Sequence, residues 1–360
     1  MSNRPFFAAR LELFLDRRLE QLFRAFGWQE RVIAYTAYGD EGFARVLGRV
    51  VLSPPFAQTV LGQAAEQFLR RRGWRNFFTA ACVHARYTIT LGDAEVTGTT
   101  DRGGYVDHRL RGHGLGPGWQ AGTIRTATSQ ESVVQAQVVG SDVRFGMVSD
   151  IADTILSTML PRPFVAAWNS FMRTEAARQA IPGMAVFYDE VLRRHPGAAV
   201  MYLSTGAWNT HGFLKRFMRR HRYPEGAMLL TDWGPTNTGW FRSGQEHKRN
   251  ALLQLTVDFP RIQWLLVGDD GQHDLDIYSE FATANPDRVL AIAIRQLTPA
   301  EQILAHGTTE PLAGDEPLPR DIPVFKAPDG RGLQRQTREF LGLSLTAAGG
   351  GVAPAASGRG

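Results

Sequence analysis

Cysteine is nearly absent from this sequence, with Cys82 alone among 360 residues. An internal disulfide is therefore excluded, as is a zinc site built from several cysteines, and a lone thiol is typical of a reducing compartment. No stretch approaches the roughly 18 consecutive apolar residues of a membrane-spanning helix. The first residues also lack the basic-then-apolar layout of a signal peptide. We expect a cytoplasmic protein.

Acidic side chains are outnumbered, 35 against 40 lysines and arginines, and the formal net charge is +5. This balance is compatible with anionic lipid, nucleic acid or phosphorylated substrates, and selects none of them. The chain shows no zinc-finger spacing, no aromatic-basic ribonucleoprotein motif and no convincing helix-turn-helix. We therefore expect no nucleic-acid partner. Hydrophobic content of 43% and charged content of 21% are those of a globular protein, long enough for two domains.

The first 30 residues form a segment of their own. Residues 6–28 place apolar and arginine side chains at helical spacing, which predicts a basic amphipathic helix. Two interpretations remain open. The helix could lie on an anionic membrane with its arginines on headgroups, as a peripheral contact, or it could dock on its own protein.

Residues 31–142 are predicted to form a β-rich module. Short runs of β-branched residues separated by Gly/Asp turns are typical of an antiparallel sandwich. A helical stretch at 56–79 interrupts them. The glycine-dense segment 111–122 is followed by strand-like sequence rather than a helix, so we expect a flexible loop there and no phosphate-binding loop.

From 143 to 306 the pattern alternates between strand and helix, which predicts a mostly parallel sheet with helices on both faces. Residues 307–360 are rich in Pro and Gly, then in Ala, Gly and Ser, and are predicted to be a linker and tail. The predicted strands are 145–150, 199–204, 227–231, 262–268 and 288–294, and the predicted helices are 151–160, 164–192, 208–221, 245–257 and 273–285.

Polar residues follow several of these strands. Asp150 ends the first one, Ser204 and Thr205 end the second, and Asp269 and Asp270 end the fourth. Ligands bind at the carboxyl ends of strands in open α/β sheets, so these residues are candidates for a site. The alternative for the first segment is a helix N-cap. The other polar candidates are His247 and Lys248, at the start of a predicted helix, and Asp274.

The order of these pieces resembles the phosphatase branch of the haloacid dehalogenase superfamily. A finer resemblance is to the actin-patch-associated phosphatidate phosphatase family, through the segments 149–154, 202–204, 247–248 and 266–269. It implies a Rossmann-like, haloacid-dehalogenase-type parallel sheet with helices on both faces, preceded by a smaller β-rich, sandwich-like domain. It also implies a Mg²⁺-dependent phosphatase that converts phosphatidate to diacylglycerol through an aspartyl-phosphate.

The resemblance assigns a role to each candidate. Asp150 would be the nucleophile, Ser204 would donate to a phosphoryl oxygen, and Lys248 would neutralise charge. The magnesium ligands would be Asp150, the backbone carbonyl of Ala152 and Asp269, with Asp270 and Asp274 holding the metal's waters or orienting Lys248. The substrate-binding candidates are Thr205, Trp233, Arg242 and His247. Trp233 and Arg242 lie in a 231–242 loop that could contact a lipid phosphate or could pack on itself.

The sequence departs from the family at position 152, where alanine replaces the second aspartate of the motif. In the family that aspartate is the general acid/base, a function worth about 10²–10⁴ in rate. Asp153 cannot simply substitute, because neighbouring residues point in different directions. We expect an impaired or inactive phosphatase, whether the alanine was introduced or is natural. The alternatives are a non-catalytic module that binds phosphorylated ligands or lipid, and a phosphatase of soluble phosphomonoesters; the oligomeric state stays open.

Overall fold

The computed structural model describes residues 22–54, 80–157, 179–231, 244–271, 273–306 and 321–342. Most of the predicted N-terminal helix, the predicted helix at 56–79, the first part of the one at 164–192, and Trp233 and Arg242 lie outside these ranges. Within them, no helix is both long enough and apolar enough to span a membrane.

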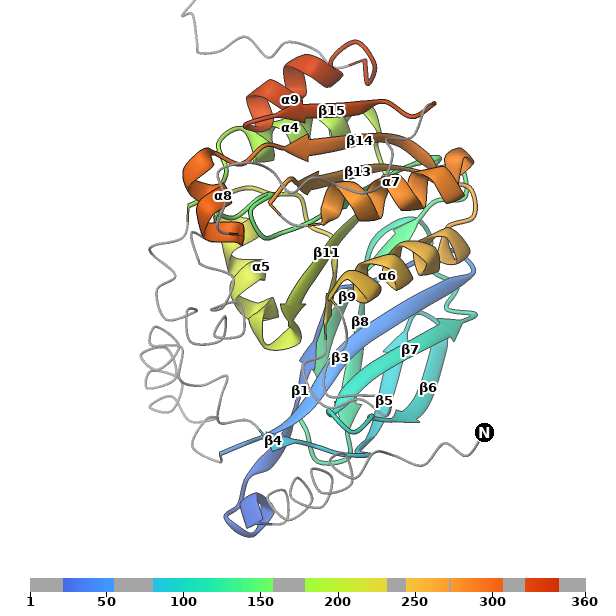
Figure 1. The fold of residues 1–360 in the computed structure, drawn as a ribbon. Coiled ribbons are helices and arrows are strands. Elements are labelled where there is room, and N and C mark those ends of the chain that lie inside the picture. Colours follow the sequence, from blue (N-terminus) through green and yellow to red (C-terminus); the bar gives the residue numbers. More distant parts are fainter. Residues whose placement is uncertain are drawn as a thin grey trace, which may run out of the picture.

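The N-terminal part forms one mixed sheet of nine strands, with the path β1-β3-β2-β9-β8-β5-β6 and with β4 and β7 also paired to β3 (Figure 1). The prediction of a β-rich module is confirmed, but its strands are not all antiparallel, because β2 and β9 pair in parallel. The strands are β1 Gln29–Ala34, β2 Ala37–Asp40, β3 Phe43–Ser53, β4 Ala80–Ala81, β5 Arg86–Leu91, β6 Ala94–Thr99, β7 Tyr105–Arg111, β8 Gly118–Thr126 and β9 Ser132–Val139.

The long strand β3 organises this sheet. It pairs with β1 and β2 along one edge and with β7 and β4 along the other. Alternation of buried and exposed residues, as in β5, turns one face of the sheet to an apolar core that includes Val46, Ile89 and Ile124. β7 was not predicted, and Gly118–Gly122 of the expected glycine-rich loop belong to β8.

The C-terminal part forms a six-stranded sheet in which every pair is parallel, as predicted. Its order is β12-β11-β10-β13-β14-β15, so the chain starts in the middle, winds to one edge, returns and winds to the other. The strands are β10 Phe145–Ser149, β11 Ala199–Ala207, β12 Ala227–Thr231, β13 Gln263–Asp269, β14 Val289–Arg295 and β15 Val324–Ala327.

Helices cover both faces of this sheet (Figure 1). Met184, Phe187 and Phe213 of α4 and α5 pack on one face, and Leu252 and Ile277 of α6 and α7 pack on the other. The central strands are therefore buried on both sides and have nearly continuous apolar sequences. The helices are α4 Met184–Arg194, α5 His211–Arg220, α6 Gly244–Asp258, α7 Asp274–Ala284, α8 Pro299–His306 and α9 Gly330–Thr337.

Two predictions in this region are wrong. Residues 151–157 are not helical; they form a turn in which Ala152 and Leu156 make an isolated bridge. Within the segment predicted to be a linker, β15 and α9 complete the sheet and one of its covering layers, because β15 pairs in parallel with β14. The folded domain therefore continues beyond residue 306.

Candidate active site

The strand order brings two aspartates together at the carboxyl edge of the sheet. β10 pairs with β11 on one side and β13 on the other, and the chain winds away from this point in both directions. Asp150 follows β10 and donates its backbone N–H to the carbonyl of Val267, 2.8 Å away, while Asp269 ends β13. Such a switch in winding direction is where open α/β sheets bind ligands.

A buried lysine joins these aspartates to a third. Lys248, in the first part of α6, donates from Nζ to Oδ1 of Asp150 at 2.7 Å and to Oδ1 of Asp274, the first residue of α7. The lysine side chain is 2% exposed and the two carboxylates are 1% exposed. Two helices from the same face thus deliver a cation and an anion to the strand end.

Burial and charge shift the ionisation of this group. Burial raises the pKa of Asp150 to about 7, against the opposing effect of Lys248. Burial, followed by the charges of Asp274 and Asp150, raises the pKa of Asp269 well above its ordinary value. Burial alone would lower the pKa of Lys248, but the two carboxylates that face it raise it instead. One ammonium therefore faces a group of buried carboxyl groups whose simultaneous ionisation is unfavourable.

The donor set fits a divalent cation. Asp150, Asp269 and Asp274 each offer a carboxylate oxygen within 4.8 Å of the others. Oδ2 of Asp150 is buried and has no hydrogen-bond partner in the described part of the chain. Carboxylate oxygens are the ligands that Mg²⁺ prefers, and a bound cation would stabilise the ionised forms of these three side chains.

Asp270 is hydrogen-bonded to groups beyond the end of β13. Its Oδ1 accepts hydrogen bonds from the backbone N–H of Leu297 and from Nε2 of Gln302, both at 2.8 Å. These contacts bind the end of β13 to the loop after β14 and to α8. Asp270 does not belong to the carboxylate group above, so its contacts support the neighbouring loop.

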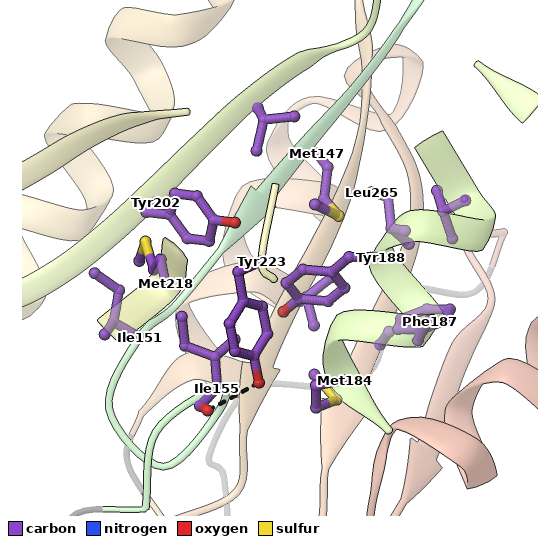
Figure 2. Close-up of a cluster of buried hydrophobic side chains, with 14 of the residues drawn as sticks. Met147, Ile151, Ile155, Met184, Phe187, Tyr188, Tyr202, Met218, Tyr223 and Leu265 are labelled. Carbon is purple, nitrogen blue, oxygen red and sulfur yellow. Dashed lines mark hydrogen bonds between the residues drawn. The ribbon is translucent and has the colours of Figure 1, made fainter. Parts of the chain in front are cut away.

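The turn after Asp150 is held by residues that the sequence did not single out. Arg295, at the end of β14, donates from Nη1 to the carbonyl of Asp153 at 2.7 Å, and Tyr223 donates to the carbonyl of Ile155 at 3.0 Å (Figure 2). Asp153 has a φ of 58°, a left-handed conformation that costs a non-glycine residue about 1–2 kcal/mol. The contacts at both carbonyls stabilise the turn against that cost.

Further hydrogen bonds hold the turn through the side chains of Ser149 and Thr154. Ser149 donates from Oγ to the carbonyl of Asp150 at 2.6 Å and lies 2.7 Å from the hydroxyl of Tyr188. Tyr188 belongs to the buried hydrophobic cluster drawn in Figure 2. On the other side, Thr154 donates to Oδ2 of Asp269 at 3.3 Å. Packing and hydrogen bonds therefore hold the backbone on both sides of Asp150, the candidate nucleophile.

The remaining candidates lie around this edge. Ser204 accepts at Oγ from the N–H of Gly206 at 3.1 Å, where the register between β11 and β12 shifts. The carbonyl of Thr205 accepts from the hydroxyl of Thr231 at 2.8 Å. His247 places Nε2 3.2 Å from the carbonyl of Leu229, against β12.

Comparison with known proteins finds similarity within the second domain. Residues 145–296 match the family described as phosphatidate phosphatase APP1, catalytic domain. Phosphatidate phosphatase APP1 of Saccharomyces cerevisiae is 28% identical over 151 residues, 42% of this chain and 25% of that protein. An uncharacterized protein of Schizosaccharomyces pombe is 24% identical over 176 residues, 48% of this chain and 29% of that protein.

These relatives are much longer proteins, since the chain spans between a quarter and a third of their length. Among solved structures, an uncharacterized protein from Listeria monocytogenes is 13% identical with a TM-score of 0.34, covering 55% of this chain and 98% of that one. A likeness this remote carries no argument about fold or function.

Proposed function

We propose that this chain has the scaffold of a Mg²⁺-dependent phosphomonoester hydrolase of the haloacid dehalogenase type, directed at phosphatidate. The observation that carries the proposal is the state of Asp150. Lys248 holds its Oδ1, whereas Oδ2 is buried and without a hydrogen-bond partner in the described residues. The activity named for the S. cerevisiae relative supports phosphatidate as the substrate.

In the proposed reaction, Oδ2 of Asp150 attacks phosphorus in line with the ester oxygen. The new oxygen–phosphorus bond forms as the ester bond breaks, and its electron pair leaves with the alkoxide. Water then attacks the phosphorus of the aspartyl-phosphate, which releases inorganic phosphate and restores the carboxylate. Lys248 stabilises the negative charge on the phosphoryl group, and Ser204 donates to one of its oxygens.

The metal is part of this proposal. Asp150, Asp269 and the backbone carbonyl of Ala152 would hold Mg²⁺, with Asp274 orienting Lys248. When bound, the metal supplies positive charge that offsets the phosphoryl oxygens and keeps the clustered carboxylates ionised. Burial and neighbouring carboxylates raise the pKa values of Asp150 and Asp269, and a bound cation would oppose that shift.

With alanine at position 152, the proposed site lacks a side chain that could transfer protons at this position. The departing alkoxide needs a proton, and the attacking water must lose one, but a methyl group stands where a carboxyl group would do both. Because an alkyl alkoxide is a poor leaving group, the loss should approach the upper part of the 10²–10⁴ range for general acid/base catalysis. We therefore expect very slow hydrolysis.

Alanine at position 152 also favours a second candidate function, a non-catalytic module that binds phosphorylated ligands. The carboxylates and Lys248 are in place, so a phosphate and a metal could bind without turnover. A phosphatase of soluble phosphomonoesters stays a third candidate, because the described residues do not select a lipid.

The decisive experiment compares this chain with Ala152→Asp for phosphate release from phosphatidate in micelles and from p-nitrophenyl phosphate, with Mg²⁺ or with EDTA. Ala152→Asn is the matched control, since it fills the same space and cannot transfer the proton. Ala152→Asp should be about a hundredfold or more faster than both, and only with Mg²⁺. Equal rates for the Asp and Asn variants would contradict the proposal, and bound phosphate without turnover would favour the binding module.

A further inference from the structure

The C-terminal end of α6 is bound by the N-terminal sheet. Asp258, the last residue of α6, accepts at Oδ2 from the hydroxyl of Tyr38 in β2, at 3.0 Å. Its Oδ1 accepts from Nη1 of Arg109 in β7 and from Nε2 of Gln254 at 2.9 Å. The Asp258 side chain is wholly buried. The two contacts from β2 and β7 are here called the latch.

Helix stability does not explain an aspartate at this position. The C-terminal end of a helix carries partial negative charge, so a carboxylate there is unfavourable unless a cation compensates it. α6 has no basic residue in its last turn. The compensating cation, Arg109, comes from the other domain, and burying the carboxylate without it would be costly. The residue therefore serves the contact between domains.

The donors of the latch are themselves fixed. Arg109 lies over the ring of Phe43, 3.5 Å from its centroid. Arg45 donates from Nη1 to the hydroxyl of Tyr38 at 2.9 Å and makes two further hydrogen bonds with Asp107, at 2.7 and 2.6 Å. The latch is thus attached to three strands of the N-terminal sheet, so it can hold α6 in one position.

Apolar packing extends the same contact along the helix. The ring of Phe259, just after α6, lies 5.9 Å from that of Tyr38 and 6.0 Å from that of Phe43. Leu252 and Leu255 of α6 share a core with these residues and with strands of the second sheet. Figure 1 shows α6 beside the N-terminal sheet, with α7 on its other side.

Lys248 lies on this same helix, ten residues before Asp258, or about 15 Å along the axis. A helix packed on two sides moves as a unit, so a shift at one end displaces the other. We propose that the N-terminal domain positions the active site: the latch sets the axial position of α6, and with it the placement of Lys248 between Asp150 and Asp274. Asp258, Arg109 and Tyr38 are then positioning residues, a role that rests on the function proposed above.

Lysine NMR tests the positioning directly. The chain has three lysines, at 215, 248 and 326, so ¹⁵Nζ labelling resolves Lys248 without reference to activity. In Asp258→Asn, the Lys248 signal should shift or broaden while the other two stay unchanged. The matched control is Glu190→Gln, which weakens another buried carboxylate–arginine pair, within α4 and far from α6 in sequence. It should leave the Lys248 signal in place.

Kinetics supply the second readout, measured in the Ala152→Asp background. Misplacing a group by about 1 Å can reduce the rate a hundredfold, so Asp258→Asn should lower kcat about tenfold or more, with a smaller change in KM. Arg109→Met should act in the same direction. If Asp258→Asn does not fold, Arg109→Met tests the positioning role instead, because the Arg109 side chain is partly exposed.

The outcomes separate the two proposals. An unmoved Lys248 signal and an unchanged kcat, with a loss of thermal stability like that of Glu190→Gln, would overturn the positioning role and leave a purely structural contact. If the Ala152→Asp parent releases no phosphate, the proposed function fails, and the NMR measurement alone decides whether the latch positions Lys248.

Discussion

Replacing Lys248 by methionine would test the electrostatic account of the site. Methionine keeps an unbranched side chain and removes the charge that faces Asp150 and Asp274. Both carboxylates would stay buried, with Asp269 close by. We expect the metal-free variant to be strongly destabilised at pH 8.

The size of the effect follows from the pKa of Asp150. Raising it from 3.8 to about 7, with Lys248 present, means that ionising Asp150 in the fold already costs about 4 kcal/mol. Removing one partner of a buried ion pair costs about 3–5 kcal/mol. Because domains are stable by only about 5–15 kcal/mol, the loss would be a large fraction of the total.

The pH dependence of this loss has a definite sign. A carboxyl group whose pKa is raised in the fold binds a proton more readily in the folded than in the unfolded state between its two pKa values, here between 3.8 and about 7. Its contribution to stability therefore rises as the pH falls through that window. Without Lys248 the folded pKa of Asp150 rises further, so the defect should be greatest at pH 8 and smaller at pH 5.5.

The assay is urea unfolding in EDTA at both pH values, followed by circular dichroism. Lys326→Met is the matched control, since it makes the same change at an exposed site in β15. Adding Mg²⁺ should recover part of the loss, because a ligand that binds only the folded state stabilises it. If Lys248→Met unfolded at the same urea concentration as Lys326→Met, the buried-pair account would be refuted.

Two other predictions concern His211 and the turn after Asp150. Burial, with a smaller effect of Lys215, lowers the pKa of His211 to about 3, so its contribution to stability is complete above pH 6.5 and declines by up to about 1.4 kcal/mol per pH unit below it. Urea titrations from pH 7.5 to 5 would measure the free energy of unfolding of the native chain and of His211→Phe. The native chain should lose stability relative to the variant with that slope as the pH falls, and a difference that stays constant with pH would contradict the prediction. Arg295→Met should cost about 1.5–3 kcal/mol, because the carboxylate of Glu301 loses its charged partner and, among the described residues, keeps only the hydrogen bonds from Thr298. Hydrogen exchange should also show faster opening of residues 150–157, whereas unchanged protection there would mean that Arg295 does not hold the turn.

The sequence alone was enough to predict the parallel sheet of the second domain and the edge at which the polar residues gather. Asp150 and Asp269 each follow a short apolar run, and such runs alternate with amphipathic helices. Parallel strands connected through helices place their carboxyl ends at one edge, so local patterns were sufficient. Lys248 was reached only through the order of the motifs, because its burial between two carboxylates depends on how α6 and α7 pack.

The local sequence pattern predicted a helix directly after Asp150, where the structure has a turn. The apolar spacing of Ile155, Met159 and Leu160 suits a helix, yet in the described residues 151–157 Arg295 and Tyr223 hold a turn at backbone carbonyls. The contact from Arg295 spans 142 positions of sequence and the one from Tyr223 spans 68. β15 was missed for a related reason, since a four-residue strand in Pro/Gly-rich surroundings is recognisable only from its pairing with β14.

The latch shows the same division between sequence and tertiary structure. Tyr38 and Asp258 lie 220 positions apart, and Arg109 lies 149 positions before Asp258; none of them belongs to a local motif. Hydrophobic periodicity and turn residues determine which elements form, because those preferences act between neighbours in the chain. The partners of a buried charge are decided only when the sheets and helices pack, because its desolvation must then be balanced by whichever groups the fold brings within reach.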